Sequence, residues 1–559
     1  MNKASFNYLL EFSVTDSQKR EEYLNKLLNR KNASEQKNVK LLKIIYRYVD
    51  ADRINDWDSD AVCKELEVKN GELDTLKSRL IADYREFIFG WDKIEKELKD
   101  NFNGTDLEFD FLKAKKMNSI GMKKEMKTFH LNFLNQLEKD RKEVMRSYNL
   151  NSSQLFLYEF ESTETMAHYY YVQKNYPQFL AFYNKLENLY KSKNKFSISE
   201  INEAIINVRL FVTRSYKHVF KVINDKNYIS ALNNLYAAQE IIKEYNLEVY
   251  RYGIPLLIAL ILFRLSDNEK LKSLCTGISG QADAEGRKSE SAVAKAYLAL
   301  LEFNRDKSLR ASAEKKIKEY YEISSEAAPY CAHTFLLIKY YVHLMSLSGE
   351  KRNTDSLMQH ALANSVLSHN KSFTFLTYYQ IENEKHFSKI LKFENPQDKM
   401  PEFIKPTNSV LEDFRKALDN ISLLMIDGNV SANTLCNVYI TYLYIIYMKD
   451  GETDIAYAEN IKGKLHRMIK TRNIAIDLNL YDAVSLALQV QEDFPIMKKT
   501  DFLNKYMYAL KKLCDTIMER AGQSIYTVLL PYSVIYTLAS RVNLQEIWEL
   551  IKKYDWREQ

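Results

Sequence analysis

The chain has 559 residues, 46% of them apolar and 28% charged, which argues against intrinsic disorder and requires several domains or one extended repeat array. Gly occurs 13 times and Pro 8 times, too rarely for the many tight turns of an all-β protein, so long helices with short connections are expected. A formal net charge of +6 is small for this length and does not indicate nucleic-acid binding over the whole surface.

The chain has five scattered cysteines: Cys63, Cys275, Cys331, Cys436 and Cys514. Their odd number and wide spacing predict neither a disulfide framework nor a structural zinc site, and they fit a reducing cytoplasm. The most apolar run, residues 256–263, is far shorter than the ~20 residues of a membrane span, and residues 1–12 lack the pattern of a secretory signal. We therefore expect a cytoplasmic protein without a membrane span.

Residues 1–100 are expected to form a small helical module. Apolar periodicity predicts three helices there, at 35–49, 58–66 and 72–89. The short turn between the last two gives the outline of a helix-turn-helix or winged-helix unit. After Asn103-Gly104, a hairpin-type dipeptide, three apolar residues alternate with acidic ones over 107–111, a strand pattern in which a wing could lie.

The third of these helices carries few residues suited to reading DNA. Its basic residues are Lys77, Arg79 and Arg85, while its apolar residues cover a wide arc that needs burial. The expected wing is acidic, and acidic and basic residues are nearly balanced over 1–100. A helical docking or dimerisation module is therefore favoured over DNA binding, which stays open as an alternative.

A basic run interleaved with methionines follows the module. It contains Lys113, Lys115, Lys116, Lys123, Lys124 and Lys127. Such a run could bind phosphates or a partner helix, and we take these six lysines as the candidate partner-binding residues. A solvated helix face would give the same pattern.

The rest of the chain is dominated by apolar residues at helical spacing. In residues 201–223 the stripe consists of Ile201, Ala204, Ile205, Val208, Phe211, Val212, Val219, Phe220 and Ile223. Similar stripes occur at 228–246, 289–303, 308–324, 327–346, 353–369, 371–391, 409–427, 431–449, 454–471, 475–492, 501–519 and 524–541. Consecutive helices with short connections pack as antiparallel neighbours, and a long series of such pairs is an α-solenoid. We therefore expect an all-α fold, with residues 277–291 as a long loop.

One helix pair resembles the tetratricopeptide repeat family. In residues 225–238, Ala231, Leu235 and Ala238 stand where that family places a small, a large and a small residue. Residues 175–186 are a weaker copy, with Phe179 in the place of the small residue. The resemblance implies a concave surface that binds a partner, and it names no ligand.

Three prolines mark a linker: Pro396, Pro401 and Pro406. Because proline cannot lie inside a helix without losing a hydrogen bond, we place a boundary there. The expected organisation is a module at 1–100, tetratricopeptide-like repeats at 101–392 and further helical repeats at 407–559.

The sequence contains none of the common catalytic motifs. It has no His-Glu-x-x-His, no nucleophile elbow and no dinucleotide fingerprint, so no catalytic residue, metal or cofactor is predicted. The 39 tyrosines include consecutive Tyr169, Tyr170 and Tyr171, and some could line a groove for a peptide. We expect a scaffold or adaptor that binds a protein or peptide. The alternative is a nucleic-acid-associated regulator that uses the N-terminal module or the 113–127 run.

Overall fold

The computed structural model describes residues 3–29, 33–51, 54–220, 225–346, 356–386, 391–392, 402–403, 408–424, 429–448, 455–472, 479–518 and 525–554. Over these ranges the chain forms 27 α-helices, a few single 3₁₀ turns and one pair of two-residue strands. The expected all-α, solenoid-like fold is confirmed, since most helices among these residues pack against their neighbours in sequence. No helix among these residues is long and apolar enough to cross a membrane.

The described residues divide into two compact units, one up to Thr377 and the other from Tyr378. The Pro-containing linker lies almost wholly outside the described residues. The three segments expected from the sequence, at 1–100, 101–392 and 407–559, therefore stay predictions.

The first unit begins with α1 Lys3–Ser13, α2 Ser17–Leu28, α3 Ala33–Asp50, α4 Ser59–Leu66 and α5 Asn70–Phe89. The last three are the helices predicted for the N-terminal module. Asp58 caps α4 by accepting a hydrogen bond from the backbone of Asp60, and α5 ends at Gly90, whose φ of 62° suits glycine. α3 packs against α1, α2, α4 and α5 around one apolar core.

The strand expected at 107–111 is wrong, because these residues lie in α7 Asp106–Ser119. Thr105 starts this helix with a capping box. Its hydroxyl accepts from the Glu108 amide at 3.3 Å, and the Glu108 carboxylate accepts from the Thr105 amide at 2.8 Å. Leu107, Phe111 and Ala114 are all buried at helical spacing. The five-residue run 107–111 is too short to distinguish the two-residue period of a strand from the 3.6-residue period of a helix, and it was predicted as a strand. The expected wing is therefore absent from these residues.

The repeats of the first unit follow α6 Trp91–Asp100 and α7. They comprise α8 Lys123–Lys139, α9 Arg141–Ser147, α10 Ser152–Val172, α11 Tyr176–Lys191, α12 Glu200–Phe220, α13 Asp225–Tyr245, α14 Gly253–Arg264, α15 Asn268–Ala284, α16 Lys288–Arg305, α17 Arg310–Ala327, α18 Ala332–Ser346, α19 Ser356–Leu367 and α20 Lys371–His386. The unit boundary falls within α20. The long loop expected at 277–291 is wrong, since α15 runs to Ala284 with Cys275, Ile278 and Ala282 buried along one face.

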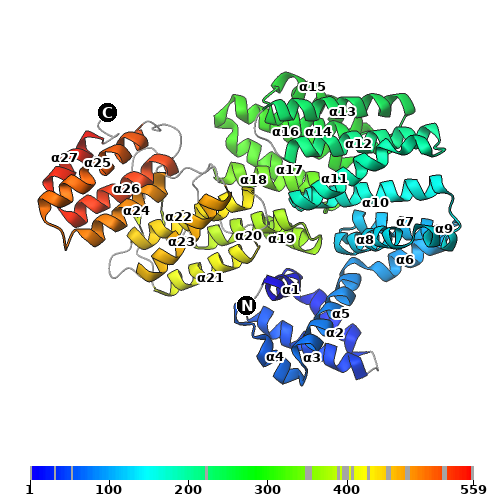
Figure 1. Cartoon of the computed structure of the whole chain (residues 1–559), viewed down its shortest axis with the longest axis horizontal. Helices are drawn as coiled ribbons and strands as arrows, with labels where there is room; N and C mark the ends of the chain where they lie inside the picture. The colour runs from blue at the N-terminus through cyan, green and yellow to red at the C-terminus, as the bar shows by residue number, and fades with distance from the viewer. Residues whose placement is uncertain are drawn as a thin grey trace. The chain divides into compact units, whose positions relative to one another are not determined.

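Consecutive helices of this unit pack as pairs, while alternate helices lie beside one another (Figure 1). α10 packs against both α8 and α12, and α16 packs against both α14 and α18. In the pair α12 and α13, Ala231, Leu235 and Ala238 are fully buried. Small residues at two of these positions allow close approach of the two helices, as the repeat-like spacing predicts.

The later helices of the unit return to the earlier ones. Tyr330, just before α18, packs its ring over Gly121 and meets Phe89 edge-on with ring centroids 5.8 Å apart. A Cβ at Gly121 would come within 2.7 Å of the Tyr330 ring, so only glycine fits this approach. α19 also contacts α1. The array therefore winds round until residues 330–370 meet residues 1–130.

The second unit contains the strands β1 Leu391–Lys392 and β2 Glu402–Phe403, which pair antiparallel, and the helices α21 Asn408–Leu424, α22 Asn429–Met448, α23 Ile455–Arg472, α24 Asn479–Asp493, α25 Lys499–Met518, α26 Ile525–Val542 and α27 Gln545–Lys553. Its centre is α22, which packs against α23, α24 and α26. Tyr439, Tyr442, Tyr444 and Tyr447 of α22 are all buried, so this tyrosine-rich helix belongs to the core.

Candidate partner-binding site

The six candidate lysines lie on α7 and α8 but do not form one patch. Lys113 is held by Asp110 at 2.9 Å and Glu95 at 3.4 Å, and Lys115 is held by Glu161 at 3.0 Å. These carboxylates neutralise the two ammonium groups. The first part of the run is therefore mostly a set of ordinary surface ion pairs.

Two lysines of the run face other parts of the fold. The Lys123 ammonium donates to the Tyr330 carbonyl at 3.3 Å. The Lys127 ammonium lies over the rings of Tyr169 and Tyr170, 5.6 and 5.7 Å from their centroids. Both side chains are half-buried. Burial lowers the pKa of each, and for Lys127 nearby cations lower it further.

The remaining two, Lys116 and Lys124, are exposed. They lie on different helices of the α7–α8 pair. The structure thus separates the six lysines into paired, partly enclosed and exposed groups, and whether any binds a partner stays a prediction.

A second set of side chains comes together from helices far apart in the sequence. On α10 and α12, the ring of Tyr171 stacks on Tyr216 at 4.2 Å, and His168 stacks on the same Tyr216 at 5.4 Å. Lys174, directly after α10, places its ammonium 4.6 Å from the centroid of Tyr171. The result is an aromatic ledge with a cation at its edge.

Two further cations approach this ledge from α14 and α18. Burial, followed by the positive charges of Lys339 and Arg264, lowers the pKa of Lys174 to about 8. Burial and the charge of Arg264 likewise lower the pKa of Lys339. Lys174, Arg264 and Lys339 therefore place their positive charges near one another, although they lie far apart in the sequence. We call the surface formed by His168, Tyr171, Lys174, Tyr216, Arg264 and Lys339 the inner surface.

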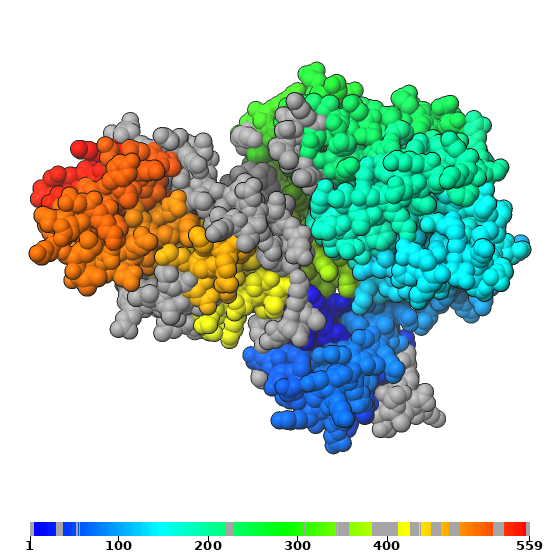
Figure 2. Space-filling model, viewed as in Figure 1, coloured from blue at the N-terminus to red at the C-terminus, as the bar shows by residue number. Residues whose placement is uncertain are grey.

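The inner surface is enclosed by protein yet open to water. Lys339 is exposed to solvent, but the surrounding protein lowers its pKa. Part of the Lys339 side chain is therefore open to water, while nearby protein atoms make its charged form less stable. In Figure 2 the turquoise atoms of the α11–α12 segment and the lime-green atoms of the α18–α19 segment appear on the same face of the first unit. These segments adjoin or carry the residues of the inner surface.

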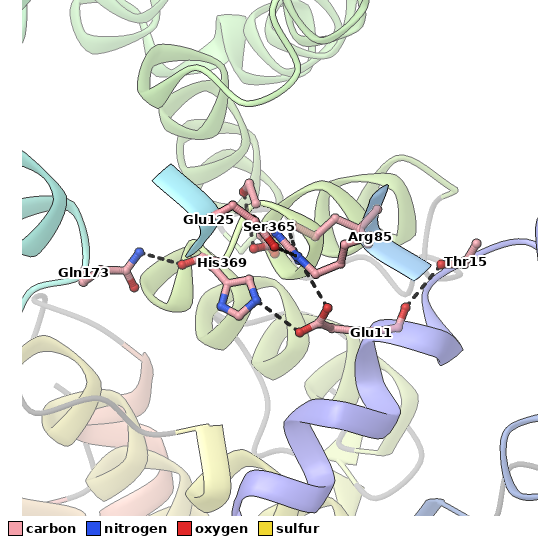
Figure 3. Close-up of polar contacts among 9 residues, drawn as sticks. Glu11, Thr15, Arg85, Glu125, Gln173, Ser365 and His369 are labelled. Carbon is pink, nitrogen blue, oxygen red and sulfur yellow. Dashed lines mark hydrogen bonds and ion pairs between the residues drawn. The ribbon is translucent and has the colours of Figure 1, made fainter. Parts of the chain in front are cut away.

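A different kind of charged cluster lies around Arg85 of α5 (Figure 3). This side chain is 1% exposed. Its Nε and Nη2 donate to the two oxygens of Glu125 at 2.7 and 3.2 Å, and its Nη1 donates to Glu11 at 3.2 Å and to the Leu367 carbonyl at 2.8 Å. The guanidinium is therefore bonded to four acceptors on three other elements, which is the arrangement a buried arginine requires.

Glu11 continues this network toward the start of α20. Its other oxygen lies 3.1 Å from Nε2 of His369, whose carbonyl accepts from the Gln173 side chain at 2.6 Å. Burial would raise the pKa of the Glu11 carboxyl, but the hydrogen bond from His369 and the charges of His369 and Arg85 outweigh it, so this pKa lies below its ordinary value. We call Glu11, Arg85, Glu125 and His369 the Arg85 junction.

The junction changes the interpretation of α5 as a DNA-reading helix. Of its three basic residues, Arg85 is buried in the junction, and Lys77 is 8% exposed with its ammonium 5.4 Å from the ring of Trp57. Arg79 is exposed. One exposed cation is too few for the phosphate contacts by which such a helix is positioned.

Sequence reasoning did not find the inner surface. Lys174 lies directly after α10, and Arg264 is the last residue of α14. Basic residues are common near helix C-termini because they stabilise the helix dipole. A basic residue in that place gives no functional signal by itself. The grouping arises only from the winding of the array. A weak clue was present in the tyrosine cluster 169–171, since Tyr171 belongs to the ledge.

Comparisons with known proteins give no family: no family model matches the chain, and no curated protein matches it. Among the residues that the structure describes, no group of three or more His, Cys, Asp or Glu side chains is arranged to hold a metal ion. The function of the chain is therefore inferred from the geometry of the described residues.

Proposed function

We propose that this chain is a non-catalytic scaffold or adaptor that holds a protein or peptide partner on the inner surface of its first unit. The observation that carries the proposal is the gathering of tyrosines and cations from α12, α14, α18 and the end of α10 on one surface. Tyrosine suits a binding surface because its ring buries apolar area while its hydroxyl remains polar.

The electrostatics of the inner surface support binding. Burial, followed by the charges of neighbouring cations, lowers the pKa values of Lys174 and Lys339. Groups with pKa values shifted in this way are common at binding sites.

The alternative, a nucleic-acid-associated regulator, has less support. Lys113 and Lys115 are held by carboxylates, and α5 offers only one exposed basic residue of its three. The resemblance to tetratricopeptide repeats, with its implied concave binding surface, favours the scaffold.

The test is purification of the tagged full chain from its own cells at near-physiological salt, with and without nuclease. A paired variant, Lys174→Gly with Lys339→Ala, removes two inner-surface cations, and Lys139→Ala on the exposed end of α8 serves as the control. We expect a stoichiometric protein that resists nuclease, is retained by the control and is depleted by the paired variant. Nucleic acid in place of a protein, or a protein retained equally by all three chains, would overturn the proposal.

A further inference from the structure

We infer that the turn between α19 and α20 is a clasp that opens and closes the first unit without unfolding of the parts that it joins. The clasp consists of residues 367–371, from the last residue of α19 to the first of α20. It lies where the late helices of the unit meet the early ones. Such a movement goes beyond the proposed function and does not depend on it.

Three side chains from separate elements hold the clasp. The Arg85 guanidinium of α5 donates to the Leu367 carbonyl at 2.8 Å. The Glu11 carboxylate of α1 lies 3.1 Å from Nε2 of His369. Gln173, directly after α10, donates to the His369 carbonyl at 2.6 Å, and Figure 3 shows it approaching His369 from the side opposite Glu11. Each contact is a hydrogen bond or an ion pair, so water can satisfy both groups when they separate.

The clasp keeps its shape through hydrogen bonds of its own. The His369 amide donates to the Val366 carbonyl at 3.0 Å, and His369 has a φ of 54°, the left-handed value at which many helices end. The Asn370 amide donates to the Ser365 carbonyl at 2.8 Å. In the first turn of α20, the Thr374 hydroxyl donates to the Asn370 carbonyl at 3.1 Å. All of these bonds are local in the sequence, so they persist when the clasp leaves its partners.

The early helices also hold together without the clasp. α1 to α5 share an apolar core whose buried members all lie within residues 8–84. Arg85 keeps its hydrogen bonds to Glu125 and Glu11 when the Leu367 carbonyl leaves, because both carboxylates belong to the early helices. The guanidinium therefore stays paired in the open unit, which avoids the large cost of a buried charge without a partner.

Gln173 connects the clasp to the inner surface. It lies between Lys174 and Tyr171, whose ring stacks on Tyr216. Its side-chain oxygen also accepts from the Lys371 amide at 3.4 Å, and the residue is 6% exposed. The clasp thus covers the end of α10 in the closed unit, and its opening uncovers this end beside the aromatic ledge. Movements of this kind use local regions that open at a lower free energy than the whole fold.

The experiment measures the distance between α5 and α19 in the full chain by double electron–electron resonance. Spin labels are attached to p-acetylphenylalanine at the positions of Arg79 and Gln359, both exposed, so the native cysteines are not labelled. We expect one main distance in the unchanged chain, from the closed unit, and a minor population at longer distance.

The paired variant Glu11→Gln with Gln173→Ala weakens both side-chain contacts to His369 and leaves Arg85 in place. Its matched control is Glu21→Gln with Gln178→Ala, at two exposed positions. We expect the longer-distance population to rise at least about threefold in the paired variant and to stay unchanged in the control. Circular dichroism should show the same helical content in all three chains.

Three outcomes would overturn the clasp. One is a single distance that is the same in all three chains. Another is a longer distance that appears only together with loss of helical signal, which would make the turn part of one cooperative fold. The third is an equal rise in the control and in the paired variant, since the contacts to His369 would then not govern the opening.

Discussion

The Arg85 junction and the inner surface both gather charge from distant parts of the first unit, yet they do so in opposite ways. At the junction, two carboxylates and a carbonyl surround one guanidinium, so each buried charge is answered inside the protein. At the inner surface, Lys174, Arg264 and Lys339 have one another as charged neighbours. Charges paired within the chain hold its parts together, whereas cations that lower one another's pKa oppose the packing that brings them close. The first region stabilises the fold, and the second contributes charges that act against it.

The largest effect is expected where the junction is broken. Arg85→Met leaves Glu11 and Glu125 without their buried cation, and we expect the free energy of unfolding to fall by about 3–5 kcal/mol. Urea unfolding followed by circular dichroism measures it. Arg79→Met on the same helix, where the side chain is exposed, should change stability by less than about 0.5 kcal/mol. Equal effects of the two substitutions would contradict the assignment of the junction as structural.

The junction should also make the fold sensitive to acid through Glu11. Because the pKa of this carboxyl is lower in the folded chain than in the unfolded one, its stabilisation is present above its ordinary pKa near 4.5 and is lost as the pH falls through the lower, folded value. Unfolding measured between pH 6 and 3 should be less steeply pH-dependent in Glu11→Gln than in the unchanged chain. Parallel pH profiles for the two chains would show that the carboxylate is not held as described.

At the inner surface, removing a charged side chain should instead increase the free energy of unfolding. Lys174→Gly removes a cation that its neighbours repel and places glycine where φ is 56°, so we expect unfolding to become harder by up to about 1 kcal/mol. The depressed pKa near 8 means that the folded chain favours neutral Lys174. The gain should therefore be greatest below pH 8 and shrink as the pH rises toward 10.5. Thermal unfolding at pH 7 and 9.5 tests this, and a loss of stability at pH 7 would contradict it.

The smallest effect is expected for the paired lysines of the 113–127 run. Lys115→Ala breaks an exposed ion pair with Glu161, which contributes roughly 0.2–1 kcal/mol. Binding of the protein partner recovered with the unchanged chain should stay within about twofold, since a twofold change is about 0.4 kcal/mol. A tenfold loss of binding in this variant would show that the partner binds the 113–127 lysine run.

Much of the fold could be predicted from the sequence because helical periodicity is a local property. The helices at 288–305, 429–448 and 499–518 begin and end within a few residues of the predicted stripes. The failures were also local in origin. Three alternating apolar residues over 107–111 fit both the period of a strand and that of a helix. The capping box at Thr105 favours the helix that forms there. The loop expected at 277–291 is largely helical, and Gly277 and Gly280 lie within α15 with open space around them.

The site could not be predicted in the same way, because its residues meet only after the array has wound round. Arg85 carried the sequence signature of a surface cation, and nothing within α5 indicates that Glu11, Glu125 and the Leu367 carbonyl surround it. Lys174, Arg264 and Lys339 likewise lie in three different repeats. Their grouping depends on the curvature of the solenoid, which accumulates from small angles between many helices and leaves no local trace.

The return of residues 330–370 to residues 1–130 has a consequence for how this unit is made and how it could be altered. An open solenoid can be shortened or lengthened at its end by one repeat, since each repeat touches only its neighbours. Here the Leu367 carbonyl completes the surroundings of Arg85, 282 residues earlier in the chain, and Tyr330 covers Gly121. Deleting or duplicating one helix pair between them would move both contacts out of register. The contacts between the early and late helices thus fix the number of repeats in this unit. During synthesis, Arg85 can acquire its last hydrogen-bond acceptor only after residue 367 has emerged.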